Sequence, residues 1–146
     1  MMRIDCMQGS VSTRTRWFTL FALTSINILN YIDRNIISAL VPAIQADLHF
    51  TDTQMGLLAS GFTLAYTVIA PVFGAIGDRG PRLKTMAVGV MIWSAATAWS
   101  GIARSFATQM AARVTVGLGE AGYSVIAPSV IADHFTRSQR GRVFAI

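Results

Sequence analysis

Four charged side chains interrupt otherwise apolar stretches of this sequence: Asp33, Arg34, Arg113 and Glu120. A charge inside a membrane span costs several kcal/mol unless it is paired or hydrated, so such residues are functional candidates. Opposite charges on two helices can form a buried pair that holds the helices together, whereas a carboxylate can also take up and release a proton. Desolvation penalises a charged carboxylate most near the membrane midplane, where Glu120 is expected. This penalty favours proton uptake and release as the role of Glu120.

Helical periodicity places further polar side chains beside these charges. At about 100° per residue, one face of the last apolar stretch carries Arg113, Gly117, Glu120 and Ser124. One face of the first stretch carries Asn27, Asn30, Tyr31 and Arg34, with Asp33 at its margin. A rise of about 1.5 Å per residue predicts that Asp33 and Arg113 lie at a similar depth, with Glu120 about 10 Å deeper. We therefore expect one polar cavity between these helices. A buried Asp33–Arg113 pair is the structural alternative there, and Arg34 can instead snorkel outward.

The composition predicts a membrane protein. Of the 146 residues, 53% are hydrophobic and 13% are charged, against about 25% charged in soluble domains. Four apolar stretches, at residues 17–41, 54–77, 85–104 and 106–132, are each long enough to cross a bilayer as a helix, and a fifth begins at about residue 142. We predict an all-α integral membrane protein with four transmembrane helices, the start of a fifth, and a polar cytoplasmic tail at residues 1–16.

The distribution of basic residues predicts the orientation in the membrane. Three lie in the N-terminal tail, three in residues 78–84 and three in residues 133–142, whereas the other two loops hold none and one. By the positive-inside rule the N-terminus is cytoplasmic. This spread over three short segments excludes a nucleic-acid groove. We also found no nucleophile, phosphate-binding loop, redox pair or metal-ligand spacing, so we predict neither an enzyme nor a cofactor.

A second group of charges follows the second apolar stretch. Residues 74–84 contain the pattern Gly74-x-x-Gly77-Asp78-Arg79-x-x-Arg82, followed by Lys84. Charges at a helix end can pair with a neighbouring helix in one conformation and separate in another. The pattern resembles the loop between helices two and three of the major facilitator superfamily. Pro81 stands where the commonest form has glycine, and the GDRxxR version is similar to the spinster-like branch.

Two further stretches resemble the same branch. One is Asn30-Tyr31-Ile32-Asp33-Arg34, and the other runs from Arg113 through Gly119-Glu120-Ala121-Gly122-Tyr123-Ser124 to Ala127-Pro128. The anion:cation symporter branch is a close rival, because it shares NY-x-DR and GEA. The Tyr123-Ser124 and Ala127-Pro128 stretch favours the spinster-like branch, and the resemblance covers residues 17–146.

This resemblance implies secondary transport by alternating access, in a fold of twelve helices arranged as two six-helix halves. It implies protons as a partner and an amphipathic lipid, such as sphingosine-1-phosphate or a lysophospholipid, or a small organic anion as substrate. Asp33 and Glu120 would be proton-coupling residues. The substrate or charge-partner candidates would be Arg34, Arg113, Asn30, Tyr31, Tyr123 and Ser124. The conformational-switch motif would comprise Gly74, Gly77, Asp78, Arg79, Arg82 and Lys84.

We expect the chain to be an N-terminal fragment of such a transporter, with the remaining helices missing. Its eleven arginines against one lysine favour a GC-rich genome and hence a bacterial inner membrane. One alternative is a complete four-helix protein that works as an oligomeric small-molecule exporter. A membrane module without transport activity is a third reading, although such a module would not need four intramembrane charges.

Overall fold

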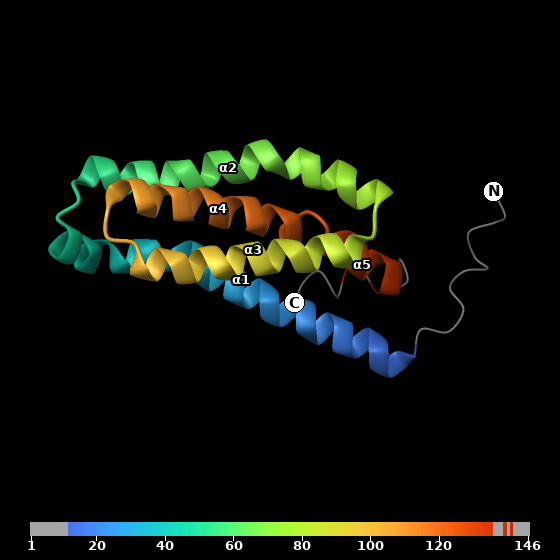
Figure 1. Cartoon of the computed structure of the whole chain (residues 1–146). Helices are drawn as coiled ribbons and strands as arrows, with labels where there is room; N and C mark the ends of the chain where they lie inside the picture. The colour runs from blue at the N-terminus through green and yellow to red at the C-terminus, as the bar shows by residue number, and fades with distance from the viewer. Residues whose placement is uncertain (1–11, 136–138, 140, 142–146) are drawn as a thin grey trace.

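A computed structural model describes residues 12–135, 139 and 141 of the chain, and these residues form an all-helical bundle. Within this part of the chain the helices are α1 (Thr13–Leu48), α2 (Asp52–Arg79), α3 (Arg82–Ile102), α4 (Phe106–Ser124) and α5 (Ala127–His134). The first four are long rods that lie side by side, and the short α5 follows α4 after a turn at residues 125–126 (Figure 1). The prediction of an all-α fold is confirmed.

Three segments of the described chain are long and apolar enough to cross a membrane: α2, α3, and residues Phe106–Asp133, which join α4 and α5. The first helix is not among them, although the sequence predicted a span at residues 17–41. Its 36 residues correspond to about 54 Å of helix, but its middle is rich in polar groups. These are Asn27, Asn30, Asp33, Arg34 and Asn35.

The end of α1 differs from the sequence prediction. We expected the helix to stop at residue 41, before Pro42, and residues 43–53 to form a loop. Instead the helix continues through Pro42 to Leu48 and ends at His49, whose φ of 54° is left-handed. Packing explains the difference, because Ile44 and Leu48 rest on a buried cluster formed with Phe50, Met55 and Leu58. This apolar contact outweighs the hydrogen bond that a proline removes from a helix.

The first helix starts at Thr13, four residues before the predicted start, and the predicted bounds of α2 and α3 and the predicted start of α4 lie within three residues of the observed ones. The last predicted span, residues 106–132, is interrupted at residues 125–126, just before Pro128. The predicted fifth helix from about residue 142 and most of the predicted tail at residues 1–16 lie outside the described residues.

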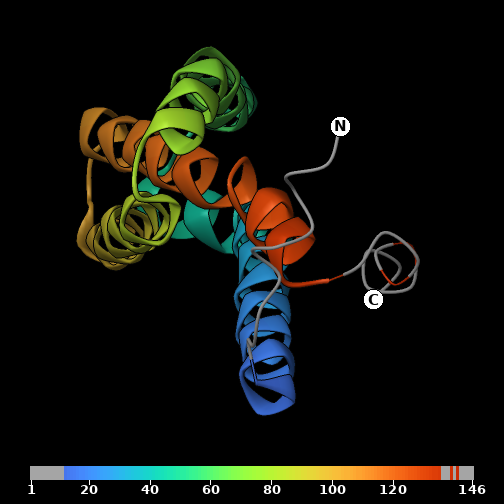
Figure 2. The ribbon, with the colours of Figure 1, turned by 90° about the vertical axis from the view of Figure 1, so that its right-hand side faces the viewer.

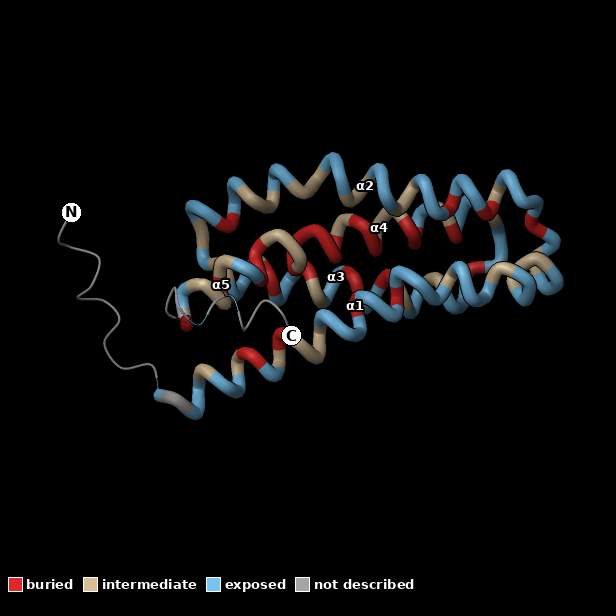
Figure 3. Tube along the Cα trace, turned by 180° about the vertical axis from the view of Figure 1, so that it is seen from behind, coloured by how far each residue is buried: buried red, intermediate tan, exposed pale blue. Residues whose placement is uncertain are grey.

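The centre of the bundle is α4, which carries more buried residues than any other helix in the described part of the chain (Figure 3). Glycines allow its backbone to approach α2 and α3 closely. A Cβ on Gly119 would lie 2.5 Å from the backbone nitrogen of Trp93, and one on Gly89 would lie 2.8 Å from the Gly119 carbonyl oxygen. On the other side, a Cβ on Gly117 would lie 2.7 Å from the Phe62 carbonyl oxygen. Small residues thus fix α2, α3 and α4 as one tightly packed unit.

The first helix joins this unit differently. Its backbone does not approach α2, α3 or α4 as closely as those three approach one another. Its N-terminal half diverges from the bundle, as Figure 2 shows for the blue end of the ribbon. Near this divergence, Leu23 packs into a buried cluster with Tyr123, Ile126 and Val130. Side chains, rather than close backbone contact, therefore attach α1 to the other helices.

The glycine contacts predict a sharp difference between two substitutions. Gly119→Ala should lower the free energy of unfolding by about 1–3 kcal/mol, because its methyl group would collide with the backbone of α3. Gly56→Ala, which has open space at the corresponding position, should be neutral or stabilise by up to about 1 kcal/mol. Unfolding of the purified variants in detergent would test this. Equal stability of the two variants would contradict the proposed close crossing.

Candidate functional site

The fully buried carboxylate of Glu120 forms an ion pair between α4 and α1. Arg34 Nε donates to Glu120 Oε2 over 2.7 Å, and the Glu120 side chain has no solvent exposure. The guanidinium of Arg34 therefore points into the bundle instead of snorkelling outward. The sequence analysis considered Asp33 and Arg113 as the pair, but the pair that the structure shows is Arg34 with Glu120. An unpaired charge at this depth would be strongly destabilising, so this contact is central to the site.

Two aromatic rings of α2 complete the surroundings of Arg34. Its Cζ atom lies 4.6 Å from the ring centroid of Tyr66 and 5.7 Å from that of Phe62. The two rings stack on each other, with centroids 6.3 Å apart. Cation–π contacts of this kind stabilise a guanidinium that has lost part of its hydration. Sequence reasoning missed both aromatic residues, because an aromatic side chain in an apolar stretch normally indicates packing.

The carboxylate of Asp33 is held by α3 instead of by an arginine. Asp33 Oδ2 accepts hydrogen bonds from Trp93 Nε1 at 2.7 Å and from Thr97 Oγ1 at 3.1 Å. Trp93 and Thr97 are four residues apart and share one face of α3. Trp93 and Thr97 were not among the predicted site residues. The Trp93 indole nitrogen and the Thr97 hydroxyl are polar contacts that the tertiary structure adds to the site.

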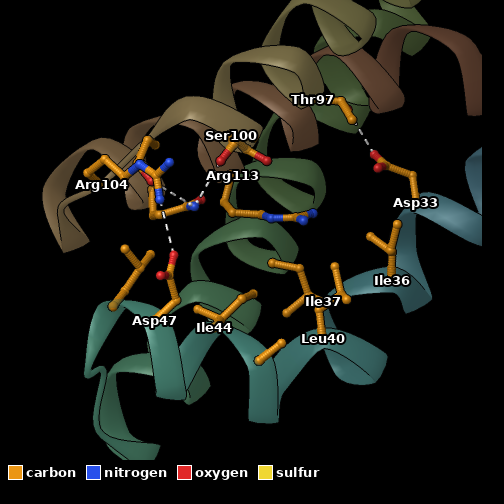
Figure 4. A pocket seen from close by; sticks show the side chains of 15 residues that line it. Asp33, Ile36, Ile37, Leu40, Ile44, Asp47, Thr97, Ser100, Arg104 and Arg113 are labelled. Atoms are coloured by element: carbon orange, nitrogen blue, oxygen red, sulfur yellow. Dashed lines mark hydrogen bonds and ion pairs between the residues drawn. The ribbon is translucent and has the colours of Figure 1, made fainter.

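A cavity of about 430 Å³ lies between α1, α3 and α4, next to Asp33. Arg113 extends into it from α4, opposite Ile37 and Leu40 of α1 (Figure 4). Its surroundings also place Arg113 within the electrostatic influence of Asp33 and Glu120. At one end of the cavity, Arg104 Nη1 contacts Asp47 Oδ2 at 3.1 Å. The cavity thus joins an apolar wall to one deeply placed positive charge.

Four buried side-chain atoms in the described part of the chain have no hydrogen-bond partner there. One is Arg16 Nε, and the other three, on the helices of the site, are Asn30 Nδ2, Arg113 Nε and Glu120 Oε1. Asn30 and Glu120 are also close enough to interact electrostatically. Buried polar atoms normally have partners, so this group has unused capacity to bind a proton, a water molecule or a polar ligand. Asp33 and Arg113 line the cavity between α1, α3 and α4, whereas neither Asn30 nor Glu120 is among its lining residues.

The other predicted site residues are divided between structural and exposed positions. The buried hydroxyl of Tyr123 donates to the Leu23 carbonyl oxygen at 2.6 Å, so it is occupied in joining α4 to α1. Tyr31 is 71% exposed. Ser124 is partly buried beside Tyr123. Of the face predicted on α1, Asn30 and Asp33 are buried, whereas Asn27 is exposed.

The loop motif lies at the other end of α4, away from the cavity. Arg82 donates from Nε to the Gly77 carbonyl oxygen at 3.0 Å and from Nη1 to Asp133 Oδ2 at 2.6 Å. A Cβ on Gly77 would touch Ile126 at 3.0 Å, and one on Gly74 would touch Val125 at 3.6 Å. The motif glycines thus seat α2 on the junction between α4 and α5.

The remaining motif residues, Asp78, Arg79 and Lys84, are exposed. Asp133, which lies on α5, was not among the predicted motif residues. Its pairing with Arg82 joins segments that are 51 residues apart.

The buried pair predicts a measurable coupling energy. In a double-mutant cycle of Arg34→Met and Glu120→Gln, we expect an interaction energy of about 1–3 kcal/mol, because Arg34→Met leaves the fully buried Glu120 carboxylate without its charged partner. The exposed pair Arg104 and Asp47 is the control, with less than about 1 kcal/mol expected from the cycle of Arg104→Met and Asp47→Asn. Unfolding measurements on all variants would test this. Equal coupling in both pairs would show that the buried pair has no special role.

Sequence comparison with known proteins identifies the family of this chain. Residues 23–146 match the Major Facilitator Superfamily. The chain is 39% identical to the protein spinster of Drosophila melanogaster over 133 residues, which are 91% of this chain and 22% of that protein. It is 40% identical to human spinster homolog 1 over 126 residues, which are 85% of this chain and 24% of that protein. The chain therefore spans about a quarter of the length of these relatives.

A solved structure shows the same fold. The crystal structure of a bacterial homologue of the human lysosomal transporter spinster, in an inward-facing and occupied conformation, matches with a TM-score of 0.86 and 35% sequence identity. The match covers 92% of this chain and 29% of that chain. The resemblance noted in the sequence is thus confirmed, and the protein is an integral, multi-pass membrane protein. This chain belongs to the Major Facilitator Superfamily, in its spinster family.

Proposed function

We propose that this chain forms the N-terminal part of a proton-coupled transporter that moves an amphipathic lipid or organic anion by alternating access. The observation that carries the proposal is the Arg34–Glu120 pair, which joins α1 to α4 through a carboxylate without solvent exposure. Asp33 supplies a second buried carboxylate one residue away on α1. The family match over residues 23–146 favours this function over a four-helix oligomeric exporter.

In this proposal Glu120 exchanges its arginine partner for a proton. Protonation forms an O–H bond on the carboxylate and removes its negative charge, so the attraction to Arg34 weakens. The free oxygen Oε1 is the available acceptor, because Oε2 already binds the guanidinium. Arg34 stays positioned on the rings of Phe62 and Tyr66. The contact between α1 and α4 then depends on protonation, which is the kind of two-state contact that alternating access requires.

The cavity beside Asp33 supports the proposed substrate class. Its apolar wall of Ile36, Ile37, Leu40 and Ile44 suits a hydrocarbon chain, and the buried Arg113 suits an anionic headgroup. A lysophospholipid or a phosphorylated long-chain base combines both features. We propose a bacterial inner membrane with the N-terminus in the cytoplasm, supported by the positive-inside pattern of the loops.

The first test of this function is the removal of the Glu120 charge. In the full-length transporter, Glu120→Gln should reduce proton-driven uptake of a fluorescent lysophospholipid into proteoliposomes by at least about tenfold, because an amide cannot carry a proton through the cycle. The variant should still accumulate in membranes. Asp52→Asn, in an exposed carboxylate at the start of α2 that does not line the cavity, is the control and should keep most of the activity. Unchanged uptake by Glu120→Gln would remove Glu120 from the coupling mechanism.

The second test concerns the loop motif. Asp78→Asn should reduce the transport rate of the same lysophospholipid by about tenfold while leaving its binding affinity within about twofold, because Asp78 lies far from the cavity at an exposed helix end. Binding measured by equilibrium methods and uptake into proteoliposomes separate the two effects. An equal loss of binding and transport would indicate misfolding instead of impaired switching.

A further inference from the structure

The two buried carboxylates of the site have chemically different partners. Glu120 pairs with a permanently charged guanidinium, whereas Asp33 receives two neutral donors, the Trp93 indole and the Thr97 hydroxyl. Both donors bind the same oxygen, Asp33 Oδ2. Trp93 is itself buried in the cluster that also contains Ala96 and Val116, so its ring cannot turn freely away from this bond. The carboxylate is thus fixed by one oxygen, while its second oxygen takes no part in these hydrogen bonds.

Asp33 lies between two cavities, which gives its carboxylate access to water or ligand from either side. It lines the cavity of about 430 Å³ that contains Arg113, and it also lines a groove of about 470 Å³ between α1 and α3. Thr97 lines both as well, and Trp93 lines the groove. Because Asp33 lines both spaces, its carboxylate is placed to contact water or a ligand, and does more than pack α1 against α3.

We propose that Trp93 and Thr97 are positioning residues that fix the Asp33 carboxylate against α3 and transmit a change in its charge to that helix. This inference rests on the proposed function, because it takes Asp33 as a group that gains and loses a proton during transport. The physical basis is that a hydrogen bond to a carboxylate is shorter and stronger than one to a neutral carboxyl group. Because an indole N–H can only donate, Trp93 loses part of its bond when Asp33 becomes neutral. Thr97 can instead turn its hydroxyl and accept.

The position of Trp93 links this event to the second carboxylate. The backbone nitrogen of Trp93 faces Gly119 at the tight crossing of α3 and α4, and Gly119 precedes Glu120. A change in how α1 binds Trp93 therefore acts on the helix crossing next to the Arg34–Glu120 pair. The other charged groups around Asp33 in the described part of the chain are Arg113 and Glu120 on α4 and its neighbour Arg34 on α1.

The indole N–H vibration of Trp93 provides a direct test in the purified full-length transporter. Vibrational spectra recorded over a pH series, with no substrate present, should show a pH-dependent weakening of one indole hydrogen bond. This change should be lost in Trp93→Phe and in Asp33→Asn, and kept in Trp99→Phe, which alters a partly exposed tryptophan of the same helix. Survival of the change in Trp93→Phe or in Asp33→Asn would overturn the proposal.

The hydroxyl of Thr97 is tested separately. Thr97→Val should change the pH at which the indole signal responds, and Thr97→Ser should restore the original value, because serine keeps the donor. Thr67→Val is the matched control, since the Thr67 hydroxyl bonds only to the Thr63 carbonyl oxygen of its own helix. Identical pH responses in Thr97→Val and the unmodified protein would overturn the role of Thr97.

A parallel transport measurement separates this inference from the proposed function. If Asp33→Asn abolishes the pH dependence of lysophospholipid uptake while the indole signal of the unmodified protein shows no pH response, the coupling role of Asp33 stands and the role of Trp93 fails. If Asp33→Asn leaves the pH dependence of uptake unchanged, Asp33 has no part in coupling, and the inference fails together with the proposed use of that residue.

Discussion

A carboxylate without solvent contact needs a partner for its charge, and this requirement determines how the helices of this chain are joined. Glu120 lies on the central helix α4, and the cation that balances it, Arg34, comes from α1. Arg34 is in turn placed by the aromatic rings of α2. One charge balance thus involves three helices. Because a lone charge at this depth is so unfavourable, any motion that separates α1 from α4 must either break this pair or neutralise it.

The bundle combines one rigid unit with one helix that is attached through polar side chains. Glycines bring α3 and α4 so close that a methyl group at Gly89 or Gly119 would meet the opposite backbone. Contacts of this kind depend on shape and do not change with protonation. The first helix is different, because Arg34 binds Glu120, Asp33 binds Trp93 and Thr97, and the Leu23 carbonyl accepts from Tyr123. Its first two attachments depend on the charge of a carboxylate. The proposed proton coupling would use this division between fixed and switchable contacts.

The same central segment connects the site to the loop motif. Glu120 lies near the end of α4, and Asp133 lies on α5, beyond the turn at residues 125–126. Arg82 of α3 binds both Asp133 and the Gly77 carbonyl at the end of α2. The junction itself is firmly packed, with Ile126 buried against Gly77. Packed residues thus connect the end of α4 to the segment that carries the exposed charges Asp78 and Arg79.

The sequence by itself determined the fold class, the approximate spans and the importance of the intramembrane charges. These properties follow from local chemistry, since hydrophobic length and the cost of a buried charge do not depend on which helices become neighbours. The motifs around Asp33, Asp78 and Glu120 also indicated the family, which comparison confirmed.

The tertiary structure decided which charges meet. Periodicity placed Tyr31 on the same face as Arg34, and depth estimates matched Asp33 with Arg113, but the observed pairing is Arg34 with Glu120. Helix rotation and tilt set these distances, and neither can be read from spacing along one chain. For the same reason, spacing along the chain did not predict three contacts of the site and the loop motif. These are the contacts of Trp93 with Asp33, of Tyr66 with Arg34 and of Asp133 with Arg82. The path of α1 past Pro42 was likewise decided by packing on Phe50 and Leu58, because tertiary contacts outweigh a local helix-breaking preference.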